Sequence, residues 1–195
     1  MKQPWDVVAA FSPERLGVLT QLLVSTRKEA LKHHEPSKGD TNWGLGCKVY
    51  ERSCYAITNA ADMHPWLEIL DDELHFVFLA GGVHLRFGRG DHEGPSPHLL
   101  KRRPNEVTAQ QLALSDEWVG WIWRLIVETD PDTLETSQVY LVQASSDGQV
   151  GHSWELNLLE NVSKLDPGAS LDDGVELPRP SVEVKPSADD EASTE

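Results

Sequence analysis

The sequence predicts an α+β fold in which two N-terminal helices pack on an antiparallel sheet of about six strands. Two observations support this prediction. Two long segments in the first third of the chain repeat apolar residues at helical spacing, and two later segments alternate apolar and polar residues between turn signals. Each later segment fits a three-strand meander, so we expect the sheet to consist of two meanders.

Residues 12–34 form the first predicted helix. Ser12 is a suitable N-cap, Pro13 takes the first helical position, and Pro36 ends the segment. An apolar stripe runs along one side of this helix. Its members are Leu16, Leu19, Leu23, Thr26 and Ala30.

Residues 45–61 form the second predicted helix, because Cys47, Tyr50, Cys54, Ile57 and Ala61 recur at spacings of three and four. On one helix the two cysteines are separated by about 10.5 Å along the axis. A disulfide needs Cα atoms within about 7 Å, so we expect both thiols to stay unpaired. Unpaired thiols suit a reducing compartment, which favours a cytoplasmic location.

The first meander is predicted over residues 66–90, with turns at residues 71–72 and 81–82. A two-residue glycine turn between alternating runs is a strong hairpin signal. The facing pairs in this register are Ile69 with Leu74, Leu67 with Phe76, and Phe78 with Leu85. Both turns then place one set of residues on a single apolar face: Leu67, Ile69, Leu74, Phe76, Phe78, Val83, Leu85 and Phe87. The opposite face carries Glu68, His75, His84 and Arg86.

The second meander is predicted over residues 118–158. Its first run, 118–128, alternates like a strand but also fits an amphipathic helix capped by Ser115. Strand is favoured because Trp, Ile and Val are good strand formers. The hairpin signal at residues 147–148 sets Leu141 opposite Trp154, Gln143 opposite His152, and Val139 opposite Leu156.

The segment between the meanders, residues 88–105, is dense in glycine, proline and charge, and a short helix is predicted after it at 106–114. Five of the 17 basic residues of the chain lie in or beside this segment. They are Arg86, Arg89, Lys101, Arg102 and Arg103. Such residues can hold phosphate or dock on an acidic partner. Together with Trp118, expected at an exposed rim, they form the predicted binding surface.

A catalytic alternative uses His75, His84 and Arg86 on the polar face of the first meander. Histidine and arginine together can act on a phosphodiester, with arginine stabilising the developing charge. The residues lack a recognisable nucleophile or carboxylate motif beside them, so an ordinary polar face is favoured. The histidine and cysteine spacings match no metal motif, and we expect neither a metal nor another cofactor.

Length and charge predict one domain, residues 1–164, followed by a disordered acidic tail, residues 165–195. The net charge of −15 disfavours nucleic acid over most of the surface and favours a protein partner with a basic surface. The sequence lacks an apolar stretch of signal-peptide or membrane-spanning length, so no membrane association is expected.

These observations favour a non-enzymatic regulator that binds another protein in a bacterial or phage cytoplasm, of the antitoxin, immunity or anti-defence type. The alternative is a nucleic-acid-binding or phosphodiester-cleaving protein. It would use the histidine and arginine face together with the basic segment at 86–103.

Overall fold

A computed structural model describes residues 2–73, 75–104, 106, 121–145 and 147–156. All of these belong to one unit of the chain, residues 1–164. Several predicted features lie outside the described residues. These are the tail at 165–195 with its boundary, Trp118, Leu74 and all but the first residue of the helix at 106–114.

Both predicted long helices are confirmed. Helix α2 spans Pro13–Leu31, and the Ser12 hydroxyl accepts a hydrogen bond from the Arg15 backbone N–H at 3.3 Å. Helix α3 spans Asn42–Met63 and is capped in the same way by Thr41. The two cysteines on α3 are unpaired, as predicted.

Three short helical turns were not predicted: α1, Pro4–Val7; η1, Pro36–Lys38; and α4, Pro97–Leu100. Helix α4 lies in the middle of the chain, so the helices are not restricted to the two N-terminal ones of the predicted fold. None of the helices in the described ranges has the length and hydropathy needed to cross a bilayer.

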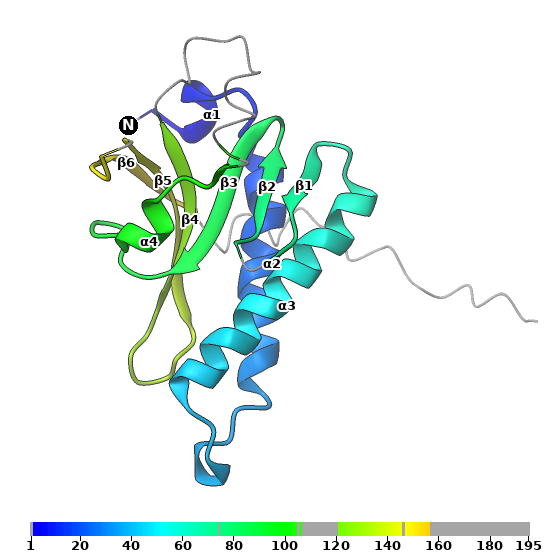
Figure 1. Cartoon of the computed structure of the whole chain (residues 1–195), viewed down its shortest axis with the longest axis vertical. Coiled ribbons are helices and arrows are strands. Elements are labelled where there is room, and N and C mark those ends of the chain that lie inside the picture. Colours follow the sequence, from blue (N-terminus) through cyan, green and yellow to red (C-terminus); the bar gives the residue numbers. More distant parts are fainter. Residues whose placement is uncertain (1, 74, 105, 107–120, 146, 157–195) are drawn as a thin grey trace, which may run out of the picture. The chain divides into compact units, whose positions relative to one another are not determined.

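Within the described residues, six strands form one sheet in the order β1-β2-β3-β4-β5-β6 (Figure 1). They are β1, Leu67–Asp71; β2, Val77–Ala80; β3, Val83–Arg89; β4, Ile122–Thr129; β5, Thr136–Ala144; and β6, Val150–Glu155. The segment 118–128 was ambiguous in sequence, and its described part from Ile122 onward lies in strand β4.

The sheet is mixed, so the prediction of an antiparallel sheet was wrong at one position. Strands β3 and β4 pair in parallel, and every other neighbouring pair is antiparallel. A parallel pair needs a connection that returns to the starting end of the sheet. This parallel pair joins the two predicted meanders side by side.

The predicted hairpin registers hold at two of three turns. Phe78 pairs with Leu85 across the 81–82 turn, where both glycines have positive φ. The 147–148 hairpin gives Leu141 opposite Trp154 and Gln143 opposite His152. The β1–β2 register was wrong, because Ile69 pairs with Phe78 instead of Leu74. This shift of four residues is even, so Leu67 and Ile69 keep their predicted face.

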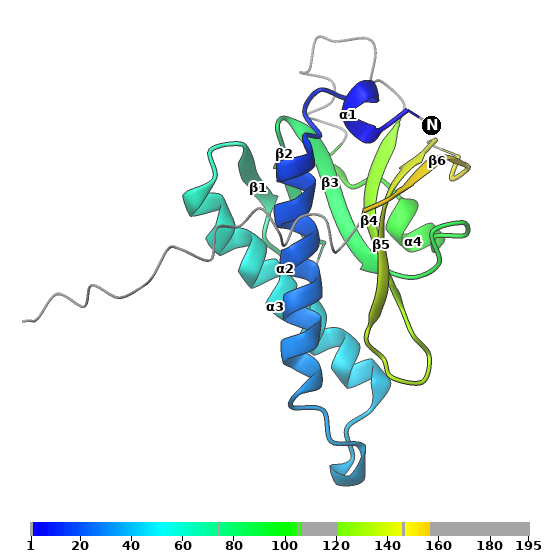
Figure 2. The ribbon, with the colours of Figure 1, turned by 180° about the vertical axis from the view of Figure 1, so that it is seen from behind.

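Helices α2 and α3 cover one face of the sheet, here called the first face (Figure 2). The buried residues of this core come from both helices and all six strands. They include Leu19, Leu23, Ile57, Leu67, Phe78, Leu85, Leu125, Leu141 and Trp154. The predicted core set Leu67, Phe76, Phe78, Leu85 and Phe87 is buried together as expected.

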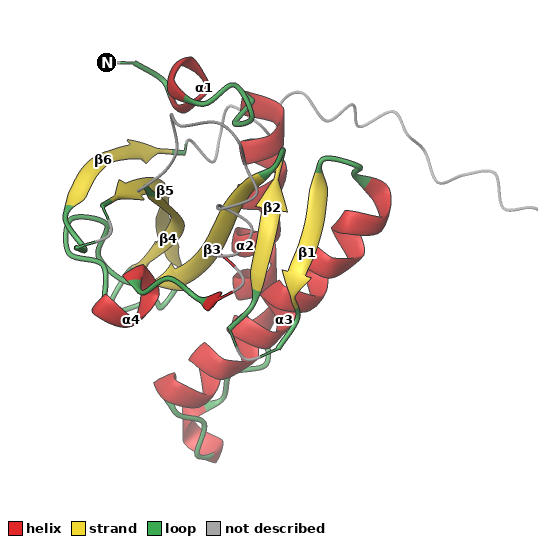
Figure 3. Cartoon of the chain, turned by 45° about the horizontal axis from the view of Figure 1, so that its top comes forward, coloured by secondary structure: helices red, strands yellow, loops and turns green. Residues whose placement is uncertain are grey.

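Helix α4 packs on the opposite, second face, close to β3 and β4 (Figure 3). Leu99 contacts Ile126 and Val142, and Leu100 belongs to a separate small apolar cluster. The close approach explains Gly88, because a Cβ there would lie 2.8 Å from a methyl carbon of Leu99. Three polar side chains of the second face are also buried under this segment: His84, Arg86 and Arg124.

Candidate functional site

Arg124 is the most completely paired charge in the described part of the molecule. Its side chain is 0% exposed and makes a bidentate pair with Glu106, at 2.8 and 3.1 Å. Its Nε also donates to the Leu99 carbonyl at 2.6 Å, and Nη1 to the Trp123 carbonyl at 2.8 Å. Burial lowers the pKa of Arg124 to about 10, against the opposing pull of Glu106, so the group stays charged at neutral pH. All three nitrogens have partners, which indicates a structural role.

Arg86 is the Cα partner of Arg124 across strands β3 and β4, and its side chain is 5% exposed. Its Nη1 donates to the backbone carbonyls of Leu99 and Lys101, at 3.4 and 3.2 Å. Burial lowers the pKa of Arg86, and the nearby Glu106 opposes that shift. This predicted binding residue therefore fastens the α4 segment to the sheet.

Of the other members of the predicted basic surface, Lys101, Arg102 and Arg103 directly follow helix α4, whereas Arg89 lies apart from them. Arg102 is half-buried and donates to the Trp121 carbonyl at 3.3 Å, while half-buried Arg103 contacts His98 at 3.2 Å. Lys101 is exposed. Arg89 is exposed and belongs to the first face, because alternate residues of β3 point to opposite sides of the sheet.

The three candidate catalytic residues are only partly brought together. His75 stacks edge-on against His98, with ring centroids 5.9 Å apart. Burial lowers the pKa of His75, and Arg103 and Arg86 lower it further, which places it near both arginines. His84 is buried, and its Nε2 has no hydrogen-bond partner within the described ranges. A general base must reach the proton that it removes, and buried His84 does not meet that condition in this conformation.

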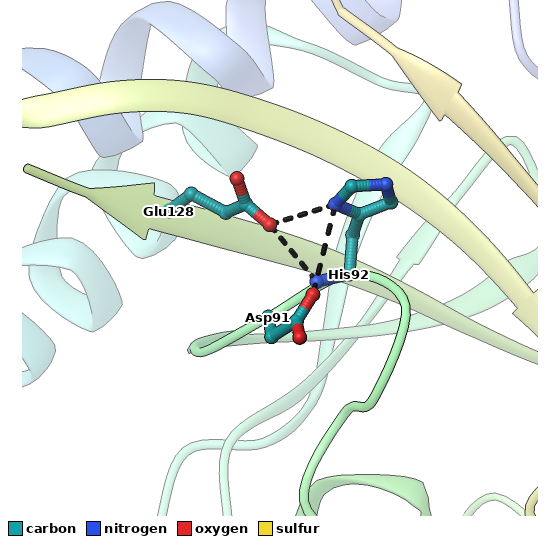
Figure 4. Close-up of side chains that lie close together, drawn as sticks. All are labelled: Asp91, His92 and Glu128. Atoms are coloured by element: carbon teal, nitrogen blue, oxygen red, sulfur yellow. Dashed lines mark hydrogen bonds and ion pairs between the residues drawn. The ribbon is translucent and has the colours of Figure 1, made fainter.

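Asp91, His92 and Glu128 form a compact polar cluster beside strand β4 (Figure 4). His92 Nδ1 lies 2.7 Å from Glu128 Oε1, and the same oxygen accepts the His92 backbone N–H at 3.0 Å. The His92 ring stacks on Tyr140 at a centroid distance of 3.7 Å. Residue types and spacing would suit a metal ion, but the loop's own N–H groups already use these carboxylate oxygens. The cluster fastens the loop to β4, and the absence of a metal site stays a prediction.

A groove of about 650 Å³ opens on the first face between helices α2 and α3 and the ends of strands β3 and β4. Apolar side chains line much of it, including Leu23, Val49, Phe87 and Val127. Trp43 stands at the groove with 80% of its surface exposed. The apolar repeat predicted on α3 continues here as groove lining, through Cys47, Tyr50 and Cys54.

The groove holds thiol and phenol groups that remain protonated. Burial raises the pKa of Tyr50 to about 12 and that of Cys54 to about 11. A thiol is nucleophilic as the thiolate, so these surroundings disfavour covalent chemistry at Cys54. The same apolar lining favours binding of apolar groups.

Arg27 is the charged side chain that the sequence reading missed. It lies on α2, is 2% exposed, and lines the groove together with Arg89. Its Nε donates to the Leu134 carbonyl at 2.6 Å, but its buried Nη2 has no hydrogen-bond partner among the described residues. Burial lowers the pKa of Arg27, and repulsion from Arg89 lowers it further. The signal available in the sequence was an arginine four residues after Leu23 and three before Ala30, within the apolar stripe.

No protein-family model, curated protein sequence or solved structure matches this chain.

Proposed function

We propose that this protein is a non-enzymatic regulator that binds another protein, and that the groove between α2 and α3 receives that partner. The observation that carries this proposal is the combination of an apolar groove with the exposed Trp43 beside it. Its volume falls within the range of about 300–1,000 Å³ typical of ligand sites. Exposed tryptophan beside an apolar hollow is also characteristic of the residues that dominate protein interfaces.

The chemistry of the groove supports binding over catalysis. Tyr50 and Cys54 line the groove, and burial raises the pKa of both. Neither is therefore activated at neutral pH. A bound apolar side chain would instead gain from the removal of its surface from water, by about 25 cal/mol per Å².

Charge supports a partner with a basic surface. The chain carries a net charge of −15, and Glu51, Asp72 and Glu73 also line the groove. Opposite charge accelerates association and disfavours acidic partners. An inhibitor of a basic protein, of the antitoxin, immunity or anti-defence type, fits this combination.

The proposal is tested by capturing proteins from a native lysate of the source cells with three forms of the chain. Trp43→Ala removes the exposed side chain at the groove. Tyr55→Ala is the matched control, because Tyr55 is 70% exposed on the same helix but does not line the groove. We expect the wild type and Tyr55→Ala to retain the same partner and Trp43→Ala to lose it. Equal retention by all three forms would contradict docking at the groove.

The nucleic-acid alternative draws less support from the basic segment. Arg86 and Arg102 donate to backbone carbonyls within the fold, and Arg86 is buried. Phosphate contacts need arginine donors that are not already used within the fold. If the wild type nevertheless bound RNA or DNA with a steep salt dependence, that alternative would replace the proposed function.

A further inference from the structure

We infer that the groove binds the C-terminal end of a basic peptide segment, with the terminal carboxylate held by Arg27 and Arg89. This inference rests on the proposed function, since it specifies which part of a protein partner enters the groove. Four features support it: an incompletely paired buried arginine, a second arginine beside it, an apolar lining, and acidic residues along the same groove.

The first feature is the unused donor of Arg27. Its side chain is 2% exposed, one nitrogen bonds the Leu134 carbonyl, and Nη2 lacks a partner within the described structure. A buried guanidinium is destabilising unless its charge and its donors are matched. A carboxylate matches both, because its negative charge balances the guanidinium and one of its oxygens can accept from Nη2.

The second feature is Arg89, which lines the same groove. The two guanidinium groups are close enough that Arg89 helps to lower the pKa of Arg27. Two cations held together at an apolar site attract an anion, and arginine is the residue best suited to bind carboxylate in such a site. An anion placed between them would also remove their mutual repulsion.

The third feature is the apolar lining, which favours a chain end over an internal acidic side chain. An internal aspartate or glutamate would carry a peptide group on each side into the groove. Each peptide group needs hydrogen-bond partners, and apolar side chains such as Leu23 and Val127 offer none. The C-terminal residue of a peptide carries its carboxylate with only one flanking peptide group, together with its side chain, which can be apolar. Fewer peptide groups then need hydrogen-bond partners in the groove. Capture of terminal carboxylates is a recurrent mode of peptide recognition.

The fourth feature is the set of acidic residues in the groove, which favours a peptide ligand over a small apolar carboxylic acid. Glu51, Asp72 and Glu73 line the groove together with the two arginines. A ligand that satisfies both kinds of charge must carry an anion and a cation. A peptide with basic residues shortly before an apolar C-terminus has this pattern, and it agrees with the net charge of −15.

Isothermal titration calorimetry with three tetrapeptides tests the inference on the full-length protein. The first is acetyl-Lys-Lys-Leu-Leu with a free carboxyl terminus, and the second is the same peptide with an amidated terminus. The third is amidated acetyl-Lys-Lys-Glu-Leu, which carries its carboxylate internally. We expect the free acid to bind at least about tenfold more tightly than either amide, the equivalent of one charge-assisted hydrogen bond.

Two variants that each remove one positive charge test whether the carboxylate binds at Arg89. Arg89→Gln should abolish the preference for the free acid. Lys28→Gln makes the same change in charge at an exposed position of α2 outside the groove, and should keep the preference. Arg27→Met should also abolish it, and thermal melting shows whether that variant is folded. If Arg27→Met does not fold, the result for Arg89→Gln alone tests the inference.

Equal affinities for free acid and amides would overturn the inference, as would equal preference in Arg89→Gln and the wild type. Tight binding of the internal glutamate peptide would overturn the assignment to a chain end. If none of the peptides binds while Trp43→Ala still loses the captured partner, this inference fails and the proposed function stands. If the free acid is preferred but Trp43→Ala retains the partner, the carboxylate site stands and docking of that partner in the groove fails.

Discussion

Arg124 and Arg27 are both buried on one sheet-packed unit, yet their surroundings differ. On the second face, every nitrogen of Arg124 has a partner, and Glu106 neutralises its charge. On the first face, the Nε of Arg27 donates to the Leu134 carbonyl, and its buried Nη2 has no partner in the described part of the chain. Burial alone therefore does not reveal what an arginine does. The number of donors left unmatched distinguishes a structural charge from a candidate binding group.

The largest effect is expected where the pairing is complete. Arg124→Met leaves Glu106 buried without its counter-ion, and should lower the free energy of unfolding by about 3–5 kcal/mol. The measurement is urea denaturation at neutral pH.

The control is the double variant Arg124→Met with Glu106→Leu, which removes both charges. It should recover most of the lost stability, because well-packed apolar residues often replace a buried ion pair at little cost. If the double variant were as unstable as the single one, lost packing or lost carbonyl bonds would explain the effect better than the unpaired charge.

A smaller effect is expected at Arg27. Arg27→Met removes one charge-assisted bond to the Leu134 carbonyl and leaves no buried counter-ion behind. The expected loss is about 1–3 kcal/mol in the same denaturation experiment. A loss as large as that of Arg124→Met would show that Arg27 is also a structural charge and would remove the contrast between the two sites.

The pH dependence of stability probes the second face separately. Burial lowers the pKa of His84; Glu106 opposes this shift, and Arg124 adds to it. The unfolded state, with a histidine pKa near about 6.5, therefore takes up the proton first as the pH falls. The free energy of unfolding should decrease as the pH falls below that value, until the folded-state pKa is passed. His84→Gln should show a shallower decrease, and parallel curves for the two proteins would contradict the assignment.

The smallest change in stability is expected at Arg89. This side chain is exposed, so Arg89→Gln should alter the free energy of unfolding by no more than about 0.5 kcal/mol. A nearly unchanged melt combined with lost carboxylate preference would place Arg89 in binding rather than in folding. Clear destabilisation by Arg89→Gln would instead assign it a structural role.

The alternation of apolar residues predicted which face each strand buries, and the structure confirms this for Phe78, Leu85 and Leu141. Alternation does not distinguish registers that differ by an even number of residues, which explains the error at Ile69. It also contains no information on which strands become neighbours. The parallel pairing of β3 and β4 was therefore not predicted.

Parts of the candidate site could be predicted only in outline. The apolar repeat of α3 was visible in the sequence, but whether it lines a core or an open groove depends on how far the sheet extends beneath it. From the sequence alone, Arg86 and Arg89 have the same predicted role as members of a basic segment. Strand alternation places them on opposite faces, and only the packed segment containing Leu99 shows that Arg86 is covered. Arg27 interrupts an apolar stripe, and its unmatched donor becomes apparent only when its neighbours are known.

The most direct test of the contrast between the two arginine sites is ¹H–¹⁵N NMR of the arginine side chains during titration with acetyl-Lys-Lys-Leu-Leu as the free acid. Single substitutions assign the Nε–H resonances. We expect the resonances of Arg27 and Arg89 to shift and saturate together, while that of Arg124 stays in place because its donors are already occupied. A shift at Arg124 with none at Arg27 and Arg89, or no saturable shift at the groove, would contradict the account.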